Sequence, residues 1–522
     1  MSNVNPSVLL RSLIVYAVCV PLAIMVGYML TNPLDYGSLG FLGVLAAVMI
    51  FPLLMKWHYP LLILSISLPA TLFFLPGRPS FFIAMVAVSL TISILERILN
   101  RNQPFLPASA VKWPLLALLG VVYLTAKLTG GFGFRAMGSD VYGGKKYLYL
   151  IIGILSFFAI TARPIPKKSA NLYITLYLLG GVFSALQDLY PFLPSFMHFL
   201  YLVFPPNSYT MRVDQWELGV TRLGGIAAGA GALFYWMVAR NGIRDNLLTR
   251  KIWRPALLVV AVLLIFLGGF RSGILGVLLI GSLLFYLEKL HRTGLMMAVV
   301  LAGLMGAALL VPLAPHLPFT FQRALAFLPL DISPDARMSA EDSTEWRLEI
   351  WDALLPQIPQ YLLLGKGFAF TAATFTESMG NDATFRNVLD AADNPLALSS
   401  DFHSGPLSVI IPFGIWGVIA WLWFWAAGFW VIWRNYRYGD AALRHINVFF
   451  FAFFIAKCFT FLFIFGAIVD DTGAFAGIIG LSIALNHGVM RPRPLPKVNP
   501  AAGDARPAIP PMVFPSPPLL ER

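Results

Sequence analysis

The residues with the clearest chemical potential are one histidine and several arginines beside apolar runs. His403 opens "HSGPLSVIIPFGIWG", Arg271 lies in "GGFRSGILG", Arg222 in "GVTRLGG" and Arg347 in "EWRLE". A neutral imidazole can take a proton from a sugar hydroxyl near neutral pH. Guanidinium groups are suited to bidentate contacts with phosphate oxygens. If the fold brings them together, these residues favour transfer of a sugar from a lipid-linked pyrophosphate to an acceptor hydroxyl.

The composition requires lipid as the solvent for most of the chain. Of 522 residues, 58% are hydrophobic and 12% are charged, whereas about 25% charged residues is usual. The two cysteines, Cys19 and Cys458, lie inside apolar runs, which excludes a disulfide framework and a thiolate metal site. We expect no metal and no cofactor. The net charge of +12 is typical of basic cytoplasmic loops and does not indicate nucleic acid.

Long apolar segments predict an all-α polytopic membrane protein, because open sheets cannot span lipid. The first segment is too long for a signal-peptide core and is interpreted as a retained span. Counting segments long enough for about 30 Å of hydrocarbon predicts about 12–14 transmembrane helices. They fall near 8–30, 37–55, 59–76, 80–97, 112–128, 147–162, 171–189, 223–240, 254–269, 272–288, 294–313, 405–433, 446–469 and 472–487.

Basic connections fall at every second loop, as the positive-inside rule requires. They include "RPIPKK" at 163–168 and "RNYRYGDAALRH" at 434–445. The predicted location is a bacterial inner membrane, with both termini cytoplasmic. The predicted regions are an amino-terminal bundle at 1–204, helices with the Arg271 motif at 205–313, a large periplasmic acidic loop at 314–404, carboxy-terminal spans at 405–489 and a disordered Pro-rich tail at 490–522.

The acidic loop is predicted to contain an amphipathic helix in "DSTEWRLEIWDALLP". Asp342 is placed to cap it, and Trp346, Ile350 and Leu354 form one apolar stripe, while Pro356 ends it. We expect this helix to lie over the outer face of the bundle.

Other residues near the expected site have structural interpretations as well. Ser404 is expected to cap the helix after His403, and Gly414 and Gly417 to permit close helix packing. Asp470 and Asp471 form an outward turn, where they could cap a helix or support the site. Lys457 lies within an apolar run, where an unpaired ammonium is costly, and we expect it to pair with a polar group of another helix.

The spacing His403-Ser404, nine residues, Gly414, two residues, Gly417 resembles the H-[NSQ]-x9-G-x2-[GTY] motif of the O-antigen ligase family. Arg271-x3-Leu275 is similar to that family's R-x3-L motif. The segment "RLEIWDALLPQIPQYLLLGKGF" is similar to the R-x3-W and P-x2-G-x-G pattern of the wider ligase and polymerase superfamily. The resemblance covers about residues 205–435 and implies about twelve spans, fewer than the number counted above.

The resemblance implies a glycosyltransferase that moves a glycan from undecaprenyl pyrophosphate to a lipid A-core hydroxyl at the periplasmic face. It implies that His403 is the base and that Arg271 and Arg222 hold the pyrophosphate; Arg347 is a further candidate for this role. The expected partners are the lipid-linked glycan, an acceptor glycolipid or growing polysaccharide, and the bilayer. An O-antigen or exopolysaccharide polymerase remains an alternative, as does a transporter of lipid-linked glycans, although we find no internal repeat.

Overall fold

The computed structural model describes residues 6–29, 31, 36–75, 77–100, 109–133, 139, 141–206, 222–371 and 402–492. Within these residues the chain is almost entirely helical, and the two short strands β1 (Val141–Tyr142) and β2 (Phe370–Thr371) pair antiparallel. The α-helices are α1 (Pro6–Met29), α2 (Tyr36–Ser65), α3 (Phe81–Leu99), α4 (Ser109–Thr129), α5 (Gly144–Ile160), α6 (Ala170–Leu179), α7 (Leu200–Val203), α9 (Gly224–Leu247), α10 (Trp253–Phe266), α11 (Arg271–Leu287), α12 (Gly294–Leu313), α13 (Phe319–Ala324), α14 (Pro334–Leu354), α15 (Ile358–Tyr361), α18 (Gly405–Tyr438), α19 (Arg444–Phe463) and α20 (Ile468–Asn486).

Among the described residues, seven helices are long and apolar enough to cross a membrane. They are Phe81–Leu99, Ala110–Thr129, Lys167–Asp188, Gly294–His316, Gly405–Tyr438, Ala441–Phe463 and Ile468–Asn486. Four shorter apolar helices accompany them: Val15–Met29, Met49–Ser65, Trp253–Phe266 and Arg271–Leu287. The predicted class, an all-α polytopic membrane protein, is confirmed.

One pair of predicted spans is wrong. The segments 37–55 and 59–76 were expected as two helices with a connection between them, but α2 runs without interruption through that connection. The helical structure ends at Ser65, and the described residues between there and Ser80 are non-helical. Pro69 and Pro79 fall within that stretch, and proline cannot donate the backbone hydrogen bond that would extend a helix.

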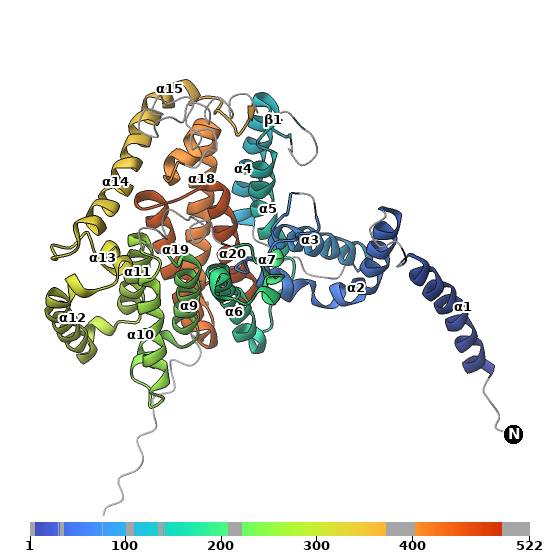
Figure 1. Ribbon diagram of the computed structural model, residues 1–522, viewed down its shortest axis with the longest axis horizontal. Helices are drawn as coiled ribbons and strands as arrows, with labels where there is room; N and C mark the ends of the chain where they lie inside the picture. The colour runs from blue at the N-terminus through green and yellow to red at the C-terminus, as the bar shows by residue number, and fades with distance from the viewer. Residues whose placement is uncertain are drawn as a thin grey trace, which may run out of the picture.

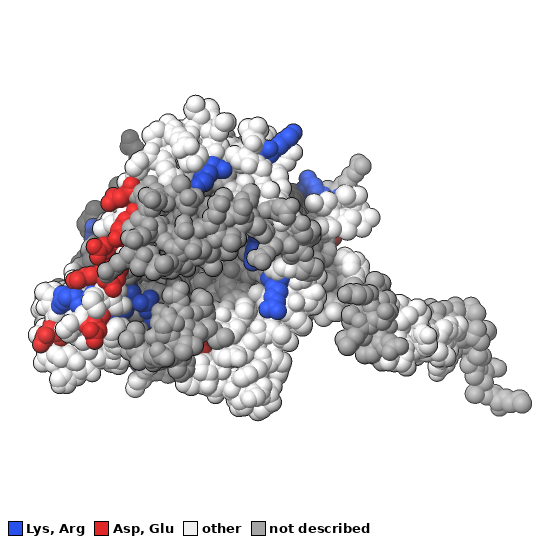
Figure 2. Space-filling model, turned by 45° about the horizontal axis from the view of Figure 1, so that its top comes forward, with Lys and Arg blue, Asp and Glu red and all other residues white. Residues whose placement is uncertain are grey.

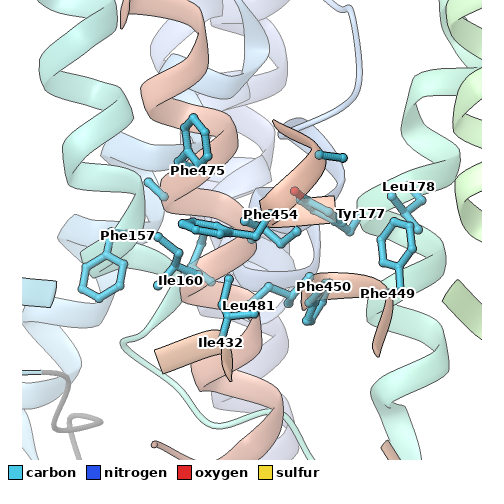
Figure 3. Close-up of a cluster of buried hydrophobic side chains, with 14 of the residues drawn as sticks. Phe157, Ile160, Tyr177, Leu178, Ile432, Phe449, Phe450, Phe454, Phe475 and Leu481 are labelled. Atoms are coloured by element: carbon cyan, nitrogen blue, oxygen red, sulfur yellow. The ribbon is translucent and has the colours of Figure 1, made fainter. Parts of the chain in front are cut away.

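Four helices, α5, α18, α19 and α20, form the centre of the bundle, where aromatic side chains interlock (Figure 3). Phe157, Phe454 and Phe475 are at most 1% exposed. Close approach of α5 and α20 depends on small residues: a Cβ at Gly153 would lie 3.1 Å from the backbone nitrogen of Gly473. Such contacts let helices associate in lipid, where apolar surface alone provides little driving force.

Two other helices have different environments. α12 has no buried residue and is apolar throughout, as expected for a helix that faces lipid. α14 runs along one flank of the bundle and leads to α15 at its end (Figure 1).

The two ends of the bundle can be named by their residues. At one end, which we call the Asn486 end, Lys167 pairs with Asp440, and the His487 ring lies 2.9 Å from the carbonyl oxygen of Ile165. This end brings together the basic segments 163–168 and 434–445. The opposite end, where α18 begins, is called the His403 end. Arg212, Asp401 and the tail after 492 lie outside the described residues.

Candidate functional site

His403 stands immediately before α18, in a backbone conformation that is rare for a residue with a side chain. Its φ is 48°, in the left-handed region, which costs on the order of 1–3 kcal/mol for a non-glycine residue. Two rings meet the imidazole edge-to-face: that of Trp346 with centroids 5.0 Å apart, and that of Phe465 at 5.2 Å. The surrounding structure therefore holds this side chain from two sides.

The residues on either side of His403 explain how the strained conformation is maintained. The Trp351 indole donates a hydrogen bond of 3.1 Å to the carbonyl of Phe402, whose side chain is 2% exposed. Phe402 packs with Ile350 and Leu354 of α14. The following residue, Ser404, occupies the N-cap position of α18, but its side chain makes no capping hydrogen bond. The expected capping role of that side chain is wrong.

Arg271 begins α11 and reaches α14. Its Nη2 donates to the carbonyl of Ala340 at 2.7 Å and to the hydroxyl of Thr344 at 2.8 Å. The guanidinium thus joins the start of a membrane helix to the helix that also contacts His403. An ammonium group at the end of a lysine side chain has different geometry and cannot reproduce this planar pattern of donors.

Two further arginines lie near the short turn before Arg271. The buried Arg323 donates from Nη1 to the carbonyl of Gly269 at 2.6 Å and from Nε to the Ser339 hydroxyl at 3.1 Å. Arg222 directly precedes Leu223, whose backbone nitrogen donates to the Leu267 carbonyl at 3.1 Å. Arg222 and Arg271 therefore flank the same turn.

Arg347 lies on the face of α14 that packs against the start of α18. Positions 347, 350, 351 and 354 are three and four residues apart, so they share one side of the helix. Ile350, Trp351 and Leu354 belong to the cluster that contains Phe402. On the same side, Thr344 is one turn before Arg347 and binds Arg271. α14 thereby links all three of Arg271, Arg347 and His403.

The predicted α14 helix exists, with its stripe of Trp346, Ile350 and Leu354 turned toward the protein. Its predicted start is wrong. The helix begins at Pro334, and the Ser333 hydroxyl accepts the capping hydrogen bond from Ala336, so Asp342 lies inside the helix. Proline in the first helical turn loses no hydrogen bond there, which favours the earlier start.

The opposite side of α14 carries exposed carboxylates in a band (Figure 2). Intramembrane carboxylates are costly, so this side of the helix faces water. The residues are Asp335, Glu341, Asp342, Glu345, Glu349 and Asp352. The His403 end therefore lies at an aqueous boundary of the bundle.

Gly414 has a role other than the expected close helix packing. It interrupts α18 with φ 61° and ψ −159°, and a Cβ there would lie 2.5 Å from the carbonyl oxygen of Leu362. The segment Tyr361–Phe368 forms hydrogen bonds with the backbone groups of α18 that the break leaves without helical partners. Lys366 and Gly367 donate to the carbonyls of Ile411 and Pro412 at 2.8 and 3.0 Å, and Ile415 donates to Leu362 at 2.7 Å. A broken helix is tolerated at membrane depth because neighbouring protein satisfies its backbone.

Gly417 lies one turn after the break. A Cβ at this position would lie 2.3 Å from Cβ of Phe413. The glycine is therefore required by the bend within α18 and not by contact with a second helix, which corrects the expected role.

The two aspartates at the start of α20 differ in their exposure. Asp470 is exposed, whereas Asp471 is buried and its Oδ1 lies 2.5 Å from Nζ of Lys457. Oδ2 of Asp471 accepts a hydrogen bond from the backbone of Ala467 at 3.0 Å. The predicted pairing of Lys457 with another helix is confirmed. The prediction that the two aspartates form the turn is wrong, because both lie in the first turn of α20, where Asp471 accepts from the N-cap residue Ala467.

An apolar cavity of about 390 Å³ starts beside the histidine and follows α18. Ser404, Trp351, Trp421 and Trp425 line it, together with Phe461 of α19. Because α18 is broken at Gly414, both parts of that helix contact Phe461. The site thus combines a polar end at water with an apolar recess.

The comparison with protein families identifies part of the chain. Residues 256–422 match the family model described as O-antigen ligase. This part of the chain is similar to the O-antigen ligase family. The matched segment contains Arg271, Arg347, His403 and both motif glycines, whereas Arg222, Lys457 and the aspartate pair lie outside it. Comparison with curated proteins gives no match.

The protein is accordingly a multi-pass membrane protein with an O-antigen ligase domain, of a general type that includes ligase and polymerase enzymes. The described residues contain no group of three or more His, Cys, Asp or Glu side chains that could hold a metal ion.

Sequence reasoning missed two residues that organise this site. Arg323 ties the turn before Arg271 to α14, and Asp188 accepts a hydrogen bond of 2.8 Å from Ile226 in the first turn of α9, close to Arg222. Both are buried. A charged residue next to an apolar segment was the available signal, because buried charges are rare without a partner.

Proposed function

We propose that this membrane enzyme transfers a glycan from undecaprenyl pyrophosphate to a sugar hydroxyl of a lipid A-core acceptor at the periplasmic face of a bacterial inner membrane. The observation that carries the proposal is the position of His403. It is fixed between two rings at an aqueous boundary, next to an apolar cavity and to the arginine-bearing face of α14.

The donor fits this arrangement by its chemistry. A polyprenyl chain is apolar and would occupy the cavity beside Ser404, whose lining is apolar as well. The pyrophosphate would then lie at the Ser404 end, where guanidinium groups of Arg347, Arg271 and Arg222 can approach its oxygens. Bidentate contacts of this kind are shorter and stronger than neutral hydrogen bonds.

The reaction requires a base because a sugar hydroxyl is a weak nucleophile at neutral pH. The acceptor oxygen forms a bond to the anomeric carbon of the donor sugar, and the bond from that carbon to pyrophosphate breaks. His403 takes the hydroxyl proton, and undecaprenyl pyrophosphate leaves with the electron pair. A positioned base is typically worth about 10²–10⁴-fold in rate.

The test is glycan transfer in purified membranes supplied with donor and acceptor across pH 5.5 to 8.5. We expect His403→Ala to insert normally but to lose about 10²–10⁴-fold in rate, with lipid-linked glycan accumulating. His403→Gln should be similarly slow, since an amide accepts no proton. His445→Ala is the matched control, an exposed histidine at the Asn486 end.

Transfer by His403→Ala at the wild-type rate and with an unchanged pH profile would remove the histidine from the chemistry. A second arm supplies the lipid-linked repeat unit as both donor and acceptor. Chain growth in that arm, without transfer to lipid A-core, would assign the protein as a polymerase.

A further inference from the structure

A partly buried ion pair joins the last two helices of the bundle. Lys457 of α19 and Asp471 of α20 are 2.5 Å apart, with side chains 28% and 8% exposed. Removing one partner of such a pair is strongly destabilising, whereas apolar replacement of both is often neutral or stabilising. Stability therefore does not by itself explain why two charges occupy this position.

Asp471 uses its second oxygen to fix the turn between those helices. Oδ2 accepts from the Ala467 nitrogen at 3.0 Å, and the Asp471 nitrogen donates to the Ala467 carbonyl at 2.9 Å. Both carboxylate oxygens are thereby engaged, one by an ammonium and one by the backbone. The carboxylate is consequently poorly placed to act as a base.

The turn fixed in this way contacts the His403 segment at more than one point. The ring of Phe465 meets the imidazole edge-to-face at 5.2 Å. Ile468 donates at 2.9 Å to the hydroxyl of Ser408, which in turn donates to the Gly405 carbonyl at 2.6 Å. A Cβ at Gly466 would come within 3.0 Å of Cα of Gly405.

We propose that the Lys457–Asp471 pair is a positioning device for His403, acting through the α19–α20 turn and Phe465. The pair holds the turn, the turn places Phe465 against one side of the imidazole, and Trp346 closes the other side. Its catalytic consequence rests on the proposed function, in which His403 is the base.

Three variants test the pair, assayed for transfer with saturating donor and acceptor. Asp471→Asn keeps an acceptor for the Ala467 nitrogen but leaves the ammonium without a counter-charge, and Lys457→Met has the converse effect. We expect each to lower kcat by about tenfold or more with little change in KM, because a misplacement of about 1 Å can cost about 10²-fold.

The double variant Lys457→Met/Asp471→Asn decides between positioning and chemistry. It removes both charges and keeps the capped turn, so we expect it to recover most of the rate lost in the single variants. A folded double variant as slow as His403→Ala would overturn the proposal and place the carboxylate in the reaction. Single variants at the wild-type rate would also overturn it. If a single variant fails to insert, the double variant alone gives the decision.

The control is the double variant Lys167→Met/Asp440→Asn, which removes an exposed ion pair at the Asn486 end.

A readout without glycan transfer keeps this inference separate from the proposed function. Carbethoxylation of His403 by diethyl pyrocarbonate is followed by mass spectrometry in wild type and variants. We expect faster modification in Asp471→Asn, because Phe465 no longer covers the ring, and a rate near wild type in the double variant. Equal rates in all three proteins would contradict the positioning device, whereas absence of transfer by the wild type would contradict only the proposed function.

Discussion

The two ends of the bundle satisfy their polar groups in different ways. At the Asn486 end, the buried side chains of Asn447 and Asn486 exchange two hydrogen bonds of 3.0 and 2.8 Å. Asn435 donates to the Ser482 hydroxyl and accepts from the Met490 nitrogen. Buried amides of this kind are paired reciprocally and leave nothing for a substrate to contact.

The His403 end has a strained histidine between two rings, a broken helix and an apolar cavity next to these features. A left-handed histidine does not by itself distinguish the two ends, because His487 at the Asn486 end has φ 58°. The broken helix and the apolar cavity do distinguish them. The difference indicates that one end stabilises the bundle through paired amides while the other surrounds a candidate binding site.

Gly414→Ala would break the His403 end most severely. The left-handed φ costs about 1–3 kcal/mol for alanine, and displacing Leu362 also removes a hydrogen bond worth about 1 kcal/mol. We therefore expect the protein to lose about 2–4 kcal/mol of stability, together with most of its transfer activity. The measurement is thermal unfolding in detergent. Gly120→Ala is the control, because nothing lies within 4 Å of its Cβ position, and an equal loss there would contradict the special role of Gly414.

Arg271→Lys would separate charge from geometry at the same end. Lysine keeps the charge but loses the planar donors that reach Ala340 and Thr344. A hydrogen bond from a charged group is worth about 1.5–3 kcal/mol, so we expect kcat/KM for transfer to fall about 10- to 100-fold. Steady-state rates over a range of donor concentrations check this. A lysine variant with wild-type kinetics would show that charge alone is needed.

Asn486→Ala tests the opposite end, where the effect should be on stability alone. Removing one amide leaves that of Asn447 buried without its partner, at a cost of about 1–3 kcal/mol. The unfolding midpoint should fall, while kcat of the remaining folded protein stays at the wild-type value. A selective loss of kcat at an unchanged midpoint would remove the distinction between the two ends.

Lys167→Met should have the smallest effect. The pair with Asp440 is largely exposed, with side chains 54% and 39% accessible, and exposed pairs contribute about 0–1 kcal/mol. We expect unfolding and transfer to remain close to wild type at physiological salt. A large shift in the unfolding midpoint would mean that the Asn486 end depends on charge as much as on its amides.

Local sequence patterns determined much of this molecule. Apolar runs predicted nearly all of the membrane helices, and the i, i+4 stripe of α14 predicted which side packs inward. The motif spacing placed His403 directly before α18. These features depend on neighbours within one or two helical turns, and helical geometry is regular enough for a single sequence to reveal them.

Only the tertiary structure decided how distant segments complete one another. The sequence identified Gly414 as a motif residue. Its structural role depends on close contact with the backbone of Leu362, which lies far from it in the chain. The partner of Lys457 and the two rings around His403 come from two separate helices and a turn. Which residues meet across a bundle depends on close packing and relative rotation of helices, and no local periodicity contains that information.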